Sequence, residues 1–184
     1  MGMFDFSAEN TVYSKRNYSL ANNPSSDAFI KLIVRIVLPP AGSLITAGAG
    51  SSYVFNLKPG NAVQITGPFG DFILKESDRE LIYLGGGAGM APLRSHLSYL
   101  FETVNTTRKV SFWYGARSSE DLFYQQYFEK LEAGNPNFSF HVSLSEPKPD
   151  DKLKWNVGFI HEYLLNSYLA SHNQPGEIEY YLCG

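Results

Sequence analysis

The chain has 184 residues and a net charge of −3 at pH 7, with 43% hydrophobic and 18% charged residues. This composition is typical of a soluble globular protein of one large or two small domains. The acidic balance argues against nucleic-acid binding, and no apolar run approaches the ~20 residues that span a bilayer. The single cysteine, Cys183, excludes an internal disulfide and an iron–sulfur cluster held by four thiolates of this chain.

The first half of the chain has the pattern of β-structure. Residues 29–37 alternate apolar and polar side chains, which predicts a half-buried strand. Residues 62–66 predict a second strand, closed by the Gly-Pro-Phe-Gly turn at 67–70. Between them, residues 48–52 precede a short apolar segment that we expect to be helical.

From about residue 80 short apolar runs alternate with helical patterns. The expected strands lie at 81–84, 110–114, 139–144 and 179–183. The expected helices lie at about 93–104, 118–131 and 159–169, the second starting at a capping-box-like pair, Ser118 and Asp121. This alternation predicts a parallel sheet with right-handed crossovers. The charged residues 76–79 mark the expected boundary, so we expect one domain at 1–77 and another at 78–184.

A glycine-rich sequence, GGGAGMAP at 85–92, lies between an expected strand and an expected helix. Glycines there let the backbone approach a ligand, and the helix start offers free N–H groups to a pyrophosphate. A tight turn without a ligand would also use glycine. Met90 or Pro92 stands where the common dinucleotide fingerprint has its third glycine, and the next strand ends in Gly-Ala-Arg without an acidic residue. These departures disfavour an ordinary dehydrogenase.

Two polar motifs in the first half could bind a second anion. In the sequence RNYS at 16–19, Arg16 and Tyr18 share one side of a strand, so they could offer a guanidinium to a phosphate and a ring to a flat heterocycle. A polar strand without a ligand fits the same four residues. At 48–52, two hydroxyls and the N–H groups of a helix start form either an anion site or a simple helix cap.

Taken together, the motifs resemble those of the ferredoxin–NADP reductase superfamily. They occur in the family's order at 16–19, 48–51, 67–70, 85–92 and 183–184. Segments 18–22, 85–96, 111–117 and 158–161 resemble more closely the family of F subunits of the bacterial sodium-translocating NADH:quinone reductases. The resemblance implies a partial antiparallel Greek-key flavin-binding barrel followed by a doubly wound parallel α/β nucleotide-binding domain. Few residues precede Arg16 and the chain stops at Gly184, so we expect a piece of a longer protein.

The resemblance also implies the site residues. For FAD they are Arg16, Tyr18, Ser19, Leu20, Gly48, Gly50, Ser51 and Ser52. For NADH they are Gly85, Gly86, Gly87, Ala88, Gly89, Met90, Pro92, Gly115, Arg117, Cys183 and Gly184. The family roles place Arg16 on the FAD pyrophosphate, Tyr18 against the isoalloxazine ring, Ser19 near flavin N5 and Cys183 beside the nicotinamide. Ser19 and Cys183 are therefore the expected catalytic residues, and the scattered histidines predict no metal site.

The function implied is hydride transfer from NADH to FAD, with electrons passed on to an iron–sulfur cluster in an upstream domain outside this chain. The implied partners are other subunits of a membrane-bound quinone reductase, at the cytoplasmic face of the bacterial inner membrane, with no membrane segment in this soluble piece. The alternatives are a reductase component of a soluble oxygenase and a non-catalytic nucleotide-binding fragment. Arg117 could pair with the 2′-phosphate of NADPH, whereas Glu120 and Asp121 nearby would oppose that charge, and the family resemblance favours NADH.

Overall fold

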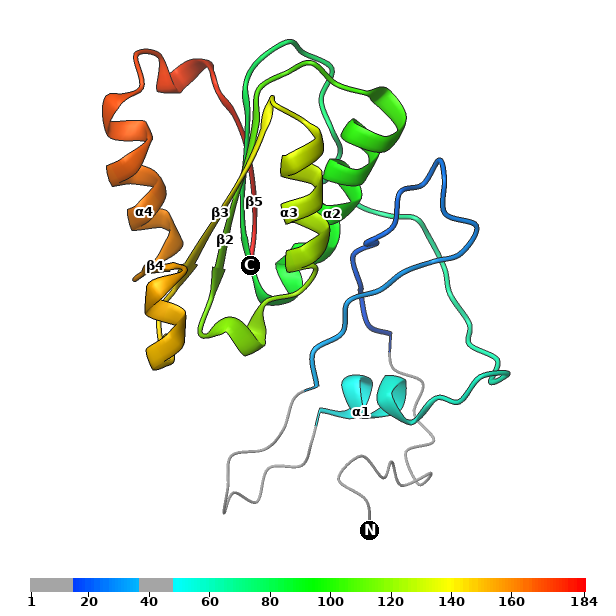
Figure 1. Cartoon of the computed structure of the whole chain (residues 1–184). Helices are drawn as coiled ribbons and strands as arrows, with labels where there is room; N and C mark the ends of the chain where they lie inside the picture. The colour runs from blue at the N-terminus through cyan, green and yellow to red at the C-terminus, as the bar shows by residue number, and fades with distance from the viewer. Residues whose placement is uncertain (1–14, 37–47) are drawn as a thin grey trace.

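A five-stranded parallel sheet forms the centre of the C-terminal half (Figure 1). The computed structural model describes residues 15–36 and 48–184. The strand order is β4-β3-β2-β1-β5, and every neighbouring pair is parallel. The strands are β1 (Leu81–Gly86), β2 (Val110–Ala116), β3 (Phe138–Leu144), β4 (Asn156–Val157) and β5 (Glu179–Cys183). The four strands predicted from residue 80 onward are confirmed, and the two-residue β4 is an addition.

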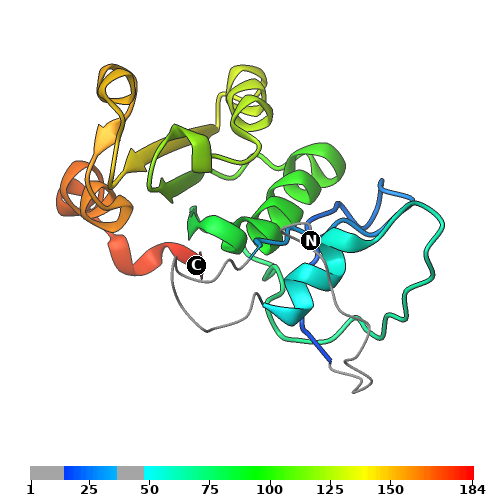
Figure 2. The same cartoon turned by 90° about the horizontal axis from the view of Figure 1, so that it is seen from below.

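Helices cover both faces of this sheet, as expected of a doubly wound domain (Figures 1 and 2). On one face lie α2 (Met90–Tyr99), which continues into a π-helical turn at Leu100–Val104, and α3 (Gln125–Gly134); on the other lies α4 (Ile160–Ser167). Alternate strand residues serve the two faces: Leu81 and Tyr83 belong to the core under α2 and α3, and Ile82 to the core under α4. Short 3-10 turns occupy Gly87–Gly89, Ser119–Asp121, Pro149–Leu153, Leu169–Ser171 and Pro175–Glu177.

The helix predicted to start at Ser118 starts later, so that prediction was wrong. Ser118 precedes only a 3-10 turn and its side chain makes no capping hydrogen bond. Asp121 pairs with Arg117, at 3.4 Å between Oδ2 and Nε, instead of closing a capping box. The chain then takes a left-handed conformation at Tyr124, with φ of 55°, and α3 begins at the next residue.

The N-terminal half contains one helix, α1 (Ala49–Asn56), at the place where a helical segment was expected. The strands predicted at 29–37 and 62–66 are not formed in the described residues, where the β-pairing outside the sheet is the antiparallel bridge between Leu20 and Leu32. Alternation alone cannot hold a strand, because its N–H and C=O groups need a partner strand and no described segment pairs with 62–66. Val37 lies outside the described residues.

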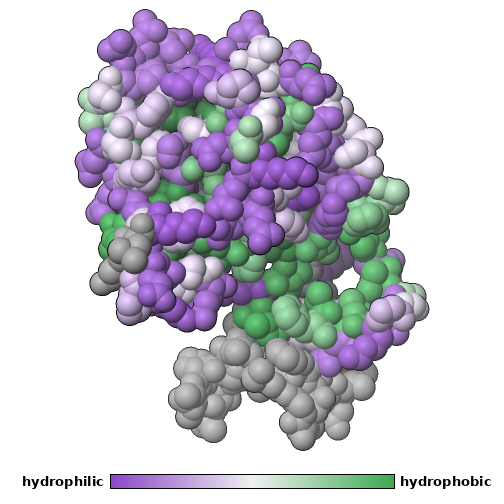
Figure 3. All heavy atoms as spheres, in the orientation of Figure 1, coloured by the Kyte–Doolittle hydropathy of each residue, from purple (hydrophilic) through white to green (hydrophobic). Residues whose placement is uncertain are grey.

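Apolar side chains are unusually exposed in this half, and Figure 3 shows hydrophobic surface gathered there. The exposed large apolar residues between 48 and 75 are Tyr53, Phe55, Val63, Ile65, Phe69, Phe72 and Ile73. The two halves nevertheless touch. The rings of Phe72 and His96 stack at 5.1 Å, and the N–H of Lys75 donates to the hydroxyl of Tyr181 at 2.9 Å. In both ribbon views the N-terminal half lies on the side of α2, away from α4.

Candidate functional site

A cleft of about 490 Å³ opens at the carboxyl ends of β1, β2, β3 and β5. The glycines at 85–87 line it after β1, Gly115 and Arg117 line it at the end of β2, and Cys183 and Gly184 line it at the end of β5. The strand order turns here, because β2 and β3 lie to one side of β1 and β5 lies to the other. In open α/β sheets this reversal leaves a crevice where nucleotides bind.

The glycines of the cleft are needed for close packing of the backbone. A Cβ on Gly89 would overlap the carbonyl of Cys183, and a Cβ on Gly86 would lie 3.0 Å from the carbonyl oxygen of Gly115. Gly87 differs, since its φ is +51° and a Cβ there would meet nothing within 4 Å. The tight-turn interpretation therefore explains Gly87, whose φ is positive, while close packing against the backbone of Cys183 explains Gly89.

The start of α2 faces this turn without side-chain caps. Its N-cap, Gly89, makes no side-chain hydrogen bond, and the first turn carries no acidic residue. The first N–H groups of a helix carry a partial positive charge that suits an anion. The backbone of this turn and the helix start therefore fit the pyrophosphate of a dinucleotide.

A second group forms around α1 and joins the two polar motifs of the N-terminal half. A Cβ on Gly50 would lie 3.0 Å from Cγ of Arg16 and 3.4 Å from the hydroxyl of Tyr18, so both side chains pass directly over the first turn of α1. Arg16 is exposed, and its Nη1 donates to the carbonyl of Lys15 at 2.8 Å. The Oγ of Ser52 is buried and has no hydrogen-bond partner among the described residues. A guanidinium, a helix turn with a glycine at position 50 and an unsatisfied hydroxyl fit the diphosphate of FAD.

Two family models match the chain. The oxidoreductase FAD-binding domain matches residues 4–73, and the oxidoreductase NAD-binding domain matches residues 83–184. The chain belongs to the oxidoreductase NAD-binding domain family. The cleft at 85–87 and 183–184 lies within the NAD-binding match, and the group around α1 lies within the FAD-binding match.

Named relatives agree with this family. The F subunit of the Na(+)-translocating NADH-quinone reductase of Idiomarina loihiensis is 48% identical over 184 residues, which is 100% of this chain and 45% of the relative. Among solved structures, the ferredoxin-NADP+ reductase of Plasmodium falciparum with 2′P-AMP has a TM-score of 0.77 at 20% identity, over 97% of this chain and 70% of that one. The Amycolatopsis cytochrome P450 reductase GcoB has a TM-score of 0.67 at 26% identity, over 92% of this chain and 48% of that one.

The predicted fold class is therefore confirmed as ferredoxin–NADP reductase-like. The chain spans less than half the length of the curated relatives that it matches. In the described ranges, 15–36 and 48–184, every helix falls short of the length and apolarity that a bilayer crossing needs. The same ranges contain no cluster of three or more potential metal-binding side chains.

The structure gathers most of the residues predicted for NADH, but not all of them. Seven line the cleft: Gly85, Gly86, Gly87, Gly115, Arg117, Cys183 and Gly184. Ala88 is exposed on the turn beside it, and Gly89 is buried against β5. The side chains of Met90 and Pro92 are buried in α2 and do not line the cleft, so their part in NADH binding stays a prediction. Pro92 also has no N–H to donate.

The residues predicted for FAD are only partly assembled. Arg16, Tyr18 and Gly50 meet at α1, whose first turn also holds Ser51 and Ser52 and is preceded by Gly48. The Oγ of Ser51 donates to the carbonyl of Gly48 at 3.0 Å. Ser19 is exposed, and Leu20 is bridged to Leu32. Tyr18 is not among the residues that line the nucleotide cleft.

The two predicted catalytic residues, Cys183 and Ser19, differ in their exposure to solvent. Cys183 is half-buried, and this burial raises the pKa of its thiol, so the group is a neutral S–H at physiological pH. Ser19 is exposed on the chain segment that leads into the bridge at Leu20.

Sequence reasoning missed several residues of the cleft. Arg35 is the one described residue of the N-terminal half that lines it, and its only signal was a charge within an apolar run. Phe159 and His161, at the start of α4, also line the cleft. They lie in the segment 158–161 that carried part of the family resemblance, which could have identified them. Asp121 lines the cleft too, together with its partner Arg117.

Proposed function

We propose that this chain is the FAD- and NADH-binding part of an NADH-oxidising reductase, of the kind named in its relatives as the F subunit of the Na(+)-translocating NADH-quinone reductase. The observation that carries the proposal is the presence, in one chain, of two separate turns whose backbone could accept a diphosphate. One is the helix turn beneath Arg16 and Tyr18, and the other is the glycine turn before α2. Each lies within its own family match.

When bound, FAD would supply the redox chemistry, namely acceptance of a hydride from NADH and release of the two electrons one at a time. The chain's own contribution is binding and orientation. Arg16 would hold the FAD diphosphate against the first turn of α1, with the hydroxyl of Ser52 as a further donor. Tyr18 would pack against the isoalloxazine ring, and Ser19 would stand near N5.

On the other side of the proposed active site, the glycine turn and the start of α2 would hold the NADH diphosphate. Cys183 would lie beside the nicotinamide, where its neutral thiol adds no charge and little polarity. The ion pair between Arg117 and Asp121 supports NADH over NADPH, because a 2′-phosphate would have to compete with the carboxylate for the guanidinium.

The wider assignment extends beyond this chain. Electrons would pass to an iron–sulfur cluster in a domain outside it and then to other subunits of a membrane-bound quinone reductase, at the cytoplasmic face of the bacterial inner membrane. Within the chain, the proposed division into a FAD-binding part, 1–77, and an NADH-binding part, 78–184, places the two diphosphate sites in different parts.

The visible absorption spectrum tests the proposal directly. Protein loaded with FAD and freed of excess cofactor is mixed anaerobically with NADH, and in a parallel sample with NADPH. We expect the flavin colour to bleach, and faster with NADH. Retained FAD with no bleaching by either nucleotide would contradict the proposal, and equal rates would contradict the preference for NADH.

A reductase component of a soluble oxygenase is the second candidate, favoured by the likeness to GcoB at 26% identity. Reading the complete gene distinguishes the two, since the quinone reductase assignment requires an upstream membrane helix and iron–sulfur domain. A non-catalytic nucleotide-binding fragment would instead show thermal stabilisation by NADH without bleaching of bound flavin.

A further inference from the structure

Three successive residues after the proposed flavin motif form the most buried segment described in the N-terminal half. Ala21 and Asn23 are exposed by only 0% and 1% of their surface, and Asn22 by 7%. Residues 15–20, immediately before them, are exposed or half-buried. A polar segment buried so completely needs a partner for each of its polar groups.

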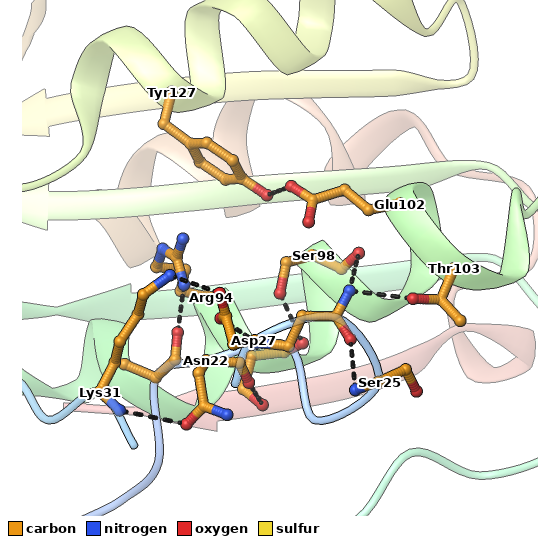
Figure 4. Close-up of polar contacts among 12 residues, drawn as sticks. Asn22, Ser25, Asp27, Lys31, Arg94, Ser98, Glu102, Thr103 and Tyr127 are labelled. Atoms are coloured by element: carbon orange, nitrogen blue, oxygen red, sulfur yellow. Dashed lines mark hydrogen bonds and ion pairs between the residues drawn. The ribbon is translucent and has the colours of Figure 1, made fainter. Parts of the chain in front are cut away.

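The partners on the far side come from α2 and the turn that follows it. Arg94 donates from Nη1 to the carbonyl of Ala21. The Oγ of Ser95 donates to the carbonyl of Asn22 at 2.7 Å. The side-chain amide of Asn23 donates to the carbonyl of Ser98 at 3.3 Å and to Oγ1 of Thr103 at 2.9 Å. Figure 4 shows Arg94, Ser98 and Thr103 directed toward this loop from one stretch of helix.

The loop is also held to itself by hydrogen bonds among residues 21–31, which keep its shape. The Asp27 carboxylate accepts from the N–H of Asn23 at 3.0 Å and from the ammonium of Lys31 at 2.8 Å (Figure 4). The Lys31 ammonium holds the pKa of Asp27 below its usual value, so the carboxylate stays charged. The N–H of Ala21 donates to the carbonyl of Lys31 at 2.9 Å, and the N–H of Lys31 donates to Oδ1 of Asn22 at 3.3 Å.

Arg94 is fixed from the other side by aromatic rings of the loop before α3 and of α3. Its guanidinium carbon lies 4.7 Å from the ring centre of Tyr124 and 5.0 Å from that of Tyr127. The side chain is buried, with 8% exposure, and its Nε has no partner among the described residues. A planar guanidinium stacked in this way has little freedom to change its direction.

The contact between residues 21–23 and α2 lies close to both proposed cofactor sites. Ser19 lies two residues before Ala21 in the chain. Arg94 lies four residues after Met90, the first residue of α2, which is roughly 6 Å along the helix axis. A shift of α2 relative to the loop would therefore move the glycine turn relative to the flavin motif by a similar amount.

We propose that Arg94 and Asn23 are positioning residues that set the distance between the nicotinamide and the flavin. The inference rests on the proposed function. Neither residue lines the cleft or belongs to the group around Gly50, so both act through the backbone elements that they join. Hydride transfer needs the reacting atoms within ~3–3.5 Å, and a misplacement of about 1 Å costs on the order of a hundredfold in rate.

The test uses FAD-loaded protein and three variants. Asn23→Ala removes both side-chain donors, and Thr103→Val removes one acceptor at an exposed position without loss of volume. Ser25→Ala is the matched control, because Ser25 is exposed in the same loop and contacts Asn23 through its backbone N–H. Anaerobic mixing with saturating NADH measures the rate of bleaching, and the long-wavelength absorbance of stacked nicotinamide and flavin rings reports their alignment.

We expect Asn23→Ala to slow bleaching by about tenfold or more, and Thr103→Val to slow it less. Both should weaken the stacking absorbance, while NADH affinity, measured by thermal shift of the flavin-free protein, stays near that of the unmodified chain. A merely destabilising change would lower affinity and rate together. If Asn23→Ala does not fold, Thr103→Val carries the test.

Bleaching as fast in Thr103→Val and Asn23→Ala as in Ser25→Ala would overturn the inference and leave the proposed function standing. An unmodified protein that retains FAD but is not bleached by NADH would overturn the proposed function, and the inference with it.

Discussion

The contact between Gly115 and α4 gives a substitution whose cost can be worked out from the structure. Gly115 lies at the end of β2, in the floor of the nucleotide cleft. A Cβ built on it would lie 2.8 Å from Cγ2 of Ile160 and 3.2 Å from its Cβ. Carbon atoms in good contact are ~3.5–4.0 Å apart, so Gly115→Ala forces β2 and α4 apart by roughly 0.7 Å.

The expected loss of stability follows from this overlap. Overpacking a core contact costs roughly 1–3 kcal/mol, and replacing glycine by alanine returns about 0.4–1 kcal/mol by restricting the unfolded chain. The net loss is about 1–2 kcal/mol, which for a chain of this length lowers Tm by roughly 2–8 °C.

Thermal unfolding followed by circular dichroism measures the effect. Gly134→Ala is the matched control, because Gly134 ends α3 and a Cβ there would meet nothing within 4 Å. We expect its Tm to stay level or rise slightly. Removing Cγ2 in the Ile160→Ala background should make Gly115→Ala less costly. Equal losses at Gly115 and Gly134, or an undiminished cost beside Ile160→Ala, would refute the reasoning.

Four further predictions follow from other sites. Because burial raises the pKa of Cys183, iodoacetamide should modify it more slowly at pH 8 than an exposed thiol, and NADH should slow the reaction further; a rate equal to that of free cysteine would contradict this. Arg16→Ala should weaken FAD retention, measured by equilibrium dialysis, and leave the circular dichroism spectrum unchanged. Arg108→Ala should cost about 2 kcal/mol in urea unfolding because it leaves the nearly buried carboxylate of Glu179 without its cation, with the hydroxyl of Ser77 still donating to it, whereas the exposed Arg79→Ala should cost less than ~0.5 kcal/mol. Burial lowers the pKa of His96, so the unfolded chain takes up a proton that the folded chain refuses; stability should fall as the pH drops below about 6.5, and less in His96→Gln.

The C-terminal half could be predicted because its signals are local. The run at 81–84 is wholly apolar and is followed by glycines, which together indicate a buried strand and a turn. The cleft followed from that order, since parallel strands bring their carboxyl ends to one edge. The start of α3 could not be predicted, because the partner that Asp121 takes, Arg117, depends on how the loop folds.

The N-terminal half was harder to predict because its structure depends on distant partners. The alternation at 29–37 predicts a strand, but alternation does not supply the neighbour that a strand needs. The contacts of Asn22 and Asn23 with α2 join residues more than 70 positions apart, and no periodicity in the sequence predicts such contacts. Arg35 reaches the cleft by the same kind of non-local packing.

In the sequence the charged residues 76–79 indicated a simple linker, but in the structure this connection is hydrogen-bonded to β5 and to the residues just before β2. The N–H of Lys75 donates a hydrogen bond to the hydroxyl of Tyr181, and the hydroxyl of Ser77 donates to the carboxylate of Glu179 at 3.1 Å. Nε of Arg108 donates to the carbonyl of Arg79 at 2.6 Å. A cut between residues 77 and 78 would therefore pass through a network shared by both sides. Chimaeras that exchange the nucleotide half between related reductases would keep these bonds only if the donor segment began before residue 75.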